Sequence, residues 1–140
     1  MLARRELSEA MVRRRLVGKG HRAEEIDAAV ARLLAERAID DVRVAEAIAR
    51  TEIAIRRRGK LRVKMAIEHA GIAAETARRT VDDVFAAVDN DALLEASLTK
   101  RLRGTDVIAD DRERQRLYRY LIGQGFEADR VLKALAARRR

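Results

Sequence analysis

Apolar residues recur along the chain at helical spacing, and short polar breaks separate one stripe from the next. The stripes are Ile26, Val30, Leu33 and Leu34; Ala77, Val81, Val84, Phe85 and Val88; Leu117, Leu121 and Ile122; and Val131, Leu132 and Leu135. Apolar positions three and four residues apart line one face of a helix. The pattern predicts helices over roughly 8–19, 23–37, 41–58, 60–70, 73–88, 91–103, 111–124 and 127–138. Polar residues suited to N-caps precede several of these helices, namely Ser8, Asp40, Asp41 and Asp110.

Three glycines mark an internal repeat. Gly20, Gly71 and Gly125 are 51 and 54 residues apart, each with an aliphatic residue four positions before it and an acid four positions after it. Each is predicted to end one helix in a left-handed conformation before the next helix begins. We therefore predict an all-α fold of tandem repeats over 1–39, 40–88 and 89–140, stacked as one continuous array. The third repeat differs by a loop over 103–110.

Composition strengthens the helical interpretation and excludes several classes of protein. The chain has no Pro and only seven Gly, whereas strand-rich folds need frequent turn residues. The absence of Cys excludes disulfides, thiolate chemistry and zinc-finger ligands. No apolar run approaches the ~20 residues that span a bilayer, and the N-terminus lacks the apolar centre of a signal peptide. We expect a cytoplasmic protein and a monomer.

The charge balance favours a polyanionic partner. Lys and Arg number 31 against 23 Asp and Glu, which gives a net charge of +8. Because the acids are interspersed among the bases, a merely well-solvated surface is the alternative interpretation. The candidate contact residues are the clustered cations Arg4, Arg5, Arg13, Arg14, Arg15, Lys19, Arg56, Arg57, Arg58, Lys60, Arg62 and Lys64. Those at 56–58 also suit the C-terminal end of a helix, whereas those at 13–15 lie in mid-helix.

The sequence offers no catalytic, cofactor-binding or metal-binding constellation. Adjacent carboxylates on a helix point about 100° apart, so the pairs at 40–41, 82–83 and 110–111 are poor metal sites and two of them suit caps. His21 and His69 lie at different turns without neighbouring ligands, and Gly18-Lys19-Gly20 lacks the strand and loop of a phosphate-binding motif. We expect a protein that is not an enzyme and has no cofactor.

Helix-turn-helix DNA recognition is a rival interpretation, since each repeat has two helices about a glycine turn. The second helices, however, begin with Glu24 and Glu25, with Glu75, and with Glu127 and Asp129. Carboxylates there would be repelled by phosphates, and the Arg, Gln or Asn that read base edges are missing. Any nucleic-acid contact is therefore expected to be with the backbone and to depend on salt.

Four segments, in order, resemble the RecX family of recombination regulators. They are LARRELS at 2–8 with the helix ending in Gly18-Lys19-Gly20, AIDDVRVA at 38–45, GKLRV at 59–63 leading to GI at 71–72, and YLIGQGF at 120–126. The match spans almost the whole chain. It departs from the usual family pattern at His21, Ala38, Val44 and Ala77, and these departures reduce the apolar volume available to the core.

The resemblance implies a fold and a function that composition could not name. It implies tandem three-helix repeats in an elongated, curved array that binds in the groove of a RecA–DNA filament. Binding would block or shorten the filament, and so regulate recombination, DNA repair and the SOS response without catalytic residues. Two alternatives stay open: a sequence-independent DNA- or RNA-binding protein that contacts phosphates, and a helical scaffold with no nucleic-acid role.

Overall fold

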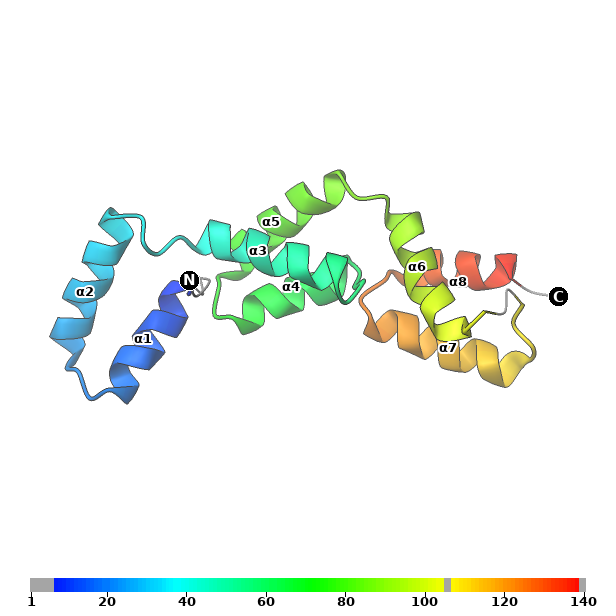
Figure 1. The fold of residues 1–140 in the computed structure, drawn as a ribbon, viewed down its shortest axis with the longest axis horizontal. Helices are drawn as coiled ribbons and strands as arrows, with labels where there is room; N and C mark the ends of the chain where they lie inside the picture. The colour runs from blue at the N-terminus through cyan, green and yellow to red at the C-terminus, as the bar shows by residue number, and fades with distance from the viewer. Residues whose placement is uncertain (1–6, 105–106, 139–140) are drawn as a thin grey trace.

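A computed structural model of the chain describes residues 7–104 and 107–138, and these residues form eight helices and no strand. The helices follow one another along an elongated molecule (Figure 1). Their bounds are α1 Glu9–Gly18, α2 Ala23–Ala35, α3 Asp41–Ala54, α4 Lys60–His69, α5 Ala74–Ala86, α6 Asn90–Leu102, α7 Asp111–Gly123 and α8 Ala128–Ala137. The all-α prediction is confirmed.

Three separate clusters of buried side chains hold the helices together. Ile26, Val30 and Ile39 form the first, in contact with Leu16 of α1. The second lies among α3, α4 and α5, and the third among α6, α7 and α8 (Figure 1). The described part of the first repeat thus has two helices where each later repeat has three. The repeat boundaries at 39/40 and 88/89 stay a prediction, and the clusters, which lie within 26–39, 44–85 and 94–135, support it.

The three repeated glycines have the same backbone conformation. Their φ angles are +87° at Gly20, +84° at Gly71 and +97° at Gly125, a region that disfavours residues with a Cβ. At the first turn the Gly20 amide donates to the Val17 carbonyl and the His21 amide to the Leu16 carbonyl. These two bonds cap the last turn of α1 and redirect the chain into α2.

Two of the helices that end earlier than the sequence predicted are followed by arginines, rather than glycines, in the left-handed conformation. α2 was expected to reach residue 37 and α3 residue 58, but they end at Ala35 and Ala54. Arg37 and Arg57 take left-handed φ angles of 57° and 50°. The Arg58 amide then donates to the Glu52 carbonyl, which closes α3 with the hydrogen-bond pattern usual at a glycine.

The apolar stripes are buried at most, but not all, of their positions. Val30, Val81, Leu121, Val131 and Leu135 have at most 1% of their surface exposed. The predicted apolar stripes are wider than the helix faces that are buried. Leu34, Ile122 and Leu132 are 43%, 38% and 46% exposed, because each lies at the margin of a stripe whose centre alone faces the cluster.

Side-chain caps begin four of the helices. Ser8 Oγ accepts from the Met11 amide, Asp40 Oδ1 from the Arg43 amide, and Asp110 Oδ1 from the Glu113 amide. Asp89 caps α6 in the same way. Asp41 was wrongly placed among the caps. It is the first residue of α3, and its carboxylate accepts from the Glu9 amide at 2.9 Å, so it joins α3 to the start of α1 instead.

Glycine turns also make the junctions between repeats. The Gly71 turn packs on the start of α1, where Ser8 Oγ donates to the Ala70 carbonyl at 2.7 Å. A Cβ on Gly71 would overlap the Ala10 Cβ.

The Gly125 turn packs in the same way on the start of α4. There the Gly59 amide donates to the Gln124 carbonyl at 2.7 Å and the Leu61 amide to the Gly125 carbonyl at 3.1 Å. Backbone approaches backbone so closely that a Cβ on Gly59 would lie 2.7 Å from the Gly125 carbonyl. A hydrogen bond of 3.1 Å from Gln124 Nε2 to the Arg56 carbonyl completes this junction.

Candidate interaction surface

Several of the predicted contact cations form ion pairs with carboxylates of the protein itself. Arg13 of α1 lies 2.8 Å from Asp27 of α2 and 3.4 Å from Glu9, so it braces the first helix pair. The Asp27 hydrogen bond is the main reason that the pKa of Arg13 is raised above its ordinary value. Lys64 faces Glu68 at 3.5 Å one turn along α4. These side chains are partly neutralised and are less available to an outside anion.

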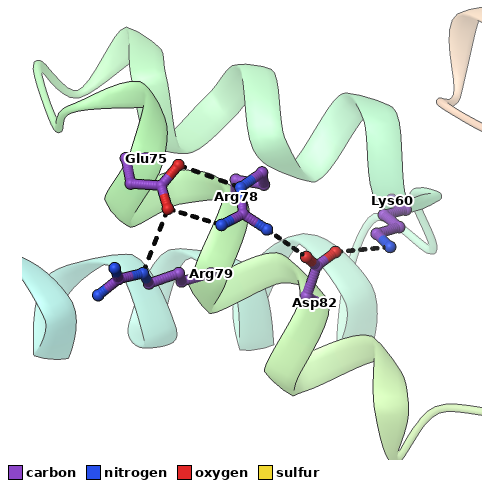
Figure 2. Close-up of polar contacts among 5 residues, drawn as sticks. All are labelled: Lys60, Glu75, Arg78, Arg79 and Asp82. Atoms are coloured by element: carbon purple, nitrogen blue, oxygen red, sulfur yellow. Dashed lines mark hydrogen bonds and ion pairs between the residues drawn. The ribbon is translucent and has the colours of Figure 1, made fainter.

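Lys60 belongs to a chain of ion pairs that spans α4 and α5. Figure 2 shows its ammonium against Asp82, which Arg78 contacts from the other side. Arg78 also contacts Glu75 at 2.6 Å, and Arg79 contacts Glu75 at 3.3 Å. The adjacent acids Asp82 and Asp83, which the sequence analysis weighed as a metal site, therefore have different surroundings. Asp82 faces Lys60 and Arg78, while Asp83 lies on the exposed surface.

These ion pairs lower the pKa values of Asp82 and Glu75. The hydrogen bond from Lys60 is the main reason that the pKa of Asp82 lies below its ordinary value, and Arg78 acts in the same direction. The hydrogen bonds from Arg78 likewise lower the pKa of Glu75. Both carboxylates stay charged through the neutral range, and the network fixes α4 against α5.

A groove of about 590 Å³ lies between α1, α3 and α4. Its apolar lining includes Met11, Ile48 and Met65, and its cations are Arg56, Arg58 and Arg62. The structure therefore gathers three of the twelve predicted contact residues beside an apolar surface. Met65 is 57% exposed, which leaves that surface open to solvent.

Within the groove the three arginines are not equivalent. Glu52 is only 8% exposed, and Arg58 meets its carboxylate at 2.8 Å, so this pair is structural. Arg56 lies farther from Glu52, at 3.9 Å, and is exposed. Arg62 has no carboxylate partner among the described residues. Arg56 and Arg62 are therefore the groove cations most able to bind an anionic group.

The remaining predicted cations lie outside the groove. Arg14, Arg15 and Lys19 are exposed on α1 and its end, without an ion pair in the described ranges, and Arg57 is exposed at the end of α3. Arg4 and Arg5 lie outside the described residues. The predicted contact set is thus divided between an open stretch of α1, the groove, and residues engaged in internal pairs.

Sequence reasoning missed the apolar half of the groove and its carboxylate. Met11, Ile48 and Met65 lie on three helices, so no local spacing relates them. The sequence did not single out Glu52 either, although it precedes Arg58 by six residues near a helix end. Among the described residues no group of three or more His, Asp or Glu could hold a metal ion, and no helix there is long and apolar enough to cross a membrane.

Comparison with known proteins places this geometry in a family. The sequence model described as "RecX, first three-helix domain" matches residues 1–33. A regulatory protein RecX of Syntrophotalea carbinolica is 32% identical over 127 residues, covering 90% of this chain and 83% of the relative. The chain belongs to the RecX family. A RecX of Neisseria meningitidis serogroup A is also 32% identical, over 96% of this chain and 84% of that protein.

Solved RecX structures share the fold. One crystal structure of a regulatory protein RecX superposes with a TM-score of 0.78 at 18% identity, covering 95% of this chain. This chain spans only 64% of that longer chain. The RecX of Lactobacillus salivarius gives a TM-score of 0.75 at 17% identity, over 95% of this chain and 86% of that one. At such identities the likeness concerns the RecX fold alone.

Proposed function

We propose that this RecX-family chain regulates a RecA-type recombinase by lying in the groove of its filament on DNA. Bound there, the protein blocks or shortens the filament, and so inhibits strand exchange, ATP hydrolysis and coprotease action. The family relationship supports a regulatory role. The observation that carries the contact surface is the groove in which Arg56 and Arg62 lie beside exposed Met65.

The shape suits such a target. Eight described helices arranged along one axis present several surfaces to a long helical assembly at once (Figure 1). When one repeat binds, the others are held near their own sites, so weak contacts add up to firm binding. The activity requires no cofactor, and it would take place in the bacterial cytoplasm, where recombinase filaments form.

The test is ATP hydrolysis by RecA on single-stranded DNA, titrated with the purified chain. We expect hydrolysis to fall at substoichiometric protein, because one bound molecule blocks growth or contact at several protomers. The groove variant R56Q/R62Q should need about five- to thirtyfold more protein for the same inhibition, because exposed charge contacts contribute about 0.5–1 kcal/mol each and two of them about 1–2 kcal/mol. Unchanged hydrolysis at excess wild-type protein would refute the proposal.

A matched control separates the groove from net charge. R50Q/R116Q removes the same two charges from exposed arginines of α3 and α7 that lie outside the groove. We expect it to inhibit like the wild type. Equal loss of inhibition in both double variants would show that overall charge, rather than the groove, carries the contact.

A second candidate function is sequence-independent binding of DNA or RNA through phosphates. The exposed Arg14, Arg15 and Lys19 favour it, since they form a cationic stretch along α1 and its C-terminal end. It predicts tight binding to DNA alone, with affinity that falls steeply as salt rises. A mobility-shift titration across salt separates the two. Weak binding to DNA that strengthens only with recombinase present supports regulation of the filament.

A further inference from the structure

The two junctions between repeats follow one hydrogen-bonding rule. In each, the carbonyl of the residue before the turn glycine accepts from the N-cap residue of a helix in the preceding repeat. Ser8 Oγ donates to the Ala70 carbonyl, and the Gly59 amide donates to the Gln124 carbonyl, both at 2.7 Å. At the second junction the amide two residues on, that of Leu61, also donates to the carbonyl of the glycine.

The same acceptors lie unused at one end of the molecule. The Lys19 and Gly20 carbonyls correspond to those of Gln124 and Gly125, and no described residue donates to either. A Cβ on Gly20 would meet nothing within 4 Å, whereas one on Gly71 or Gly125 would strike another repeat. His21 is exposed, although Ile72 and Phe126 at the matching positions are buried.

The matching donors lie unused at the opposite end. Asp110 is the N-cap of α7, and Asp110 and Arg112 stand where Gly59 and Leu61 stand at the start of α4. Neither the Asp110 amide nor the Arg112 amide donates to an acceptor among the described residues. The turn between α1 and α2 and the start of α7 lie at the two ends of the elongated molecule (Figure 1).

Charge also matches the two ends. The turn carries exposed Lys19 and Arg22, and the start of α7 carries exposed Asp110 and Asp111. Opposite charges on surfaces that must meet steer and orient an encounter, most strongly at low salt.

We propose that a second copy of this chain docks on these ends, with the glycine turn at 18–22 of one copy against the start of α7, at 110–113, of the next. Such a contact joins unlike surfaces and leaves one free surface of each kind, so the copies associate head to tail and can extend further. Each added copy continues the stacking that the repeats already follow inside the chain. The proposal is independent of the recombinase.

The contact between copies is weaker than the internal junctions. Asp110 carries a Cβ where Gly59 has none, so the turn cannot approach as closely as at Gly125. Ser8 shows that a junction tolerates a side chain at this position. The internal junctions are also tethered by the chain, which raises the local concentration of their partners. The sequence-based expectation of a monomer therefore describes the dilute protein.

The test is sedimentation equilibrium of the full chain over a concentration series at low and high salt. We expect the average mass to rise above the monomer with concentration and to fall with salt. Lys19→Glu or Asp111→Lys alone should weaken association about five- to tenfold, since each replaces an attraction by a repulsion. The control variants Arg50→Glu and Asp83→Lys make the same charge changes at exposed sites of the middle repeat and should leave association unchanged.

Recovery distinguishes docking from a damaged fold. The double variant K19E/D111K restores opposite charges across every contact. An equimolar mixture of K19E and D111K restores them wherever the two variants alternate, so association should return in both samples. A chain that stays monomeric at every concentration would overturn the proposal. So would single variants that are not rescued by mixing, or controls that weaken association as much as the end variants do.

Discussion

Replacing Gly125 by Ala tests the junction between the second and third repeats most sharply. The new Cβ would overlap the amide and the Cβ of Arg62 and lie 2.8 Å from the Gly59 carbonyl oxygen. The positive φ of +97° adds strain of its own. Left-handed backbone costs a non-glycine residue about 1–2 kcal/mol, and overpacking costs about 1–3 kcal/mol. We expect a loss of about 2–5 kcal/mol from a total stability of roughly 5–15 kcal/mol.

Two other glycines supply matched controls for this variant. Gly20→Ala has the same backbone strain, at φ +87°, but its Cβ meets nothing within 4 Å. It should lose only about 1–2 kcal/mol. Gly18→Ala, in α1 with open space around it, has neither cost and should be neutral or slightly stabilising, by up to about 0.5 kcal/mol.

The assay is urea unfolding followed by helical circular dichroism, with small-angle scattering in native buffer. If the repeats part to relieve the overlap in Gly125→Ala, the hydrogen bonds from Gly59 and Leu61 are lost and the radius of gyration changes, while the isolated repeats stay helical. Gly20→Ala should show no such change of shape. If Gly125→Ala is no more destabilising than Gly20→Ala and its scattering matches the wild type, the junction does not hold the repeats together.

Two further predictions concern ion pairs. Arg58→Gln should destabilise the chain by about 1–3 kcal/mol, because the buried carboxylate of Glu52 loses its partner at 2.8 Å; urea unfolding of this variant beside exposed Arg50→Gln measures it, and equal stability would contradict it. Lys60 lowers the pKa of Asp82 in the folded state. The contribution of Asp82 to the free energy of unfolding is therefore present above its pKa in the unfolded chain, and it is lost as pH falls through its pKa in the folded protein. Asp82→Asn should therefore lose part of the dependence of unfolding free energy on pH below about pH 4 but keep the dependence above about pH 5, and an unchanged acid dependence would count against the network.

The sequence predicted the helices and their order well because their signals are local. Ser8, Asp40 and Asp110 stand directly before their helices, and each accepts a hydrogen bond from an amide in the first turn. The early end of α3 was missed because Arg57, a residue with no special preference for it, takes the left-handed conformation. The Gly59 amide that follows donates to the Gln124 carbonyl of the next repeat, a contact that no local pattern records.

The interaction surface was predictable only in part, for the same physical reason. Clusters of cations can be read from the sequence, but whether a cation is free depends on residues far away. Lys60 is held by Asp82 and Arg13 by Asp27, whereas Arg62 lies open in a groove. Composition and spacing could not separate these three residues, since the pairing carboxylates come from other helices.

The most direct measurement is an electron cryo-microscopy map of RecA filaments on single-stranded DNA with the chain added at saturating concentration. We expect extra helical density in the filament groove that spans more than one protomer, with the groove between α1, α3 and α4 against the recombinase. Filaments that stay full-length and bare at saturation, or density that follows only exposed DNA, would contradict regulation through the filament.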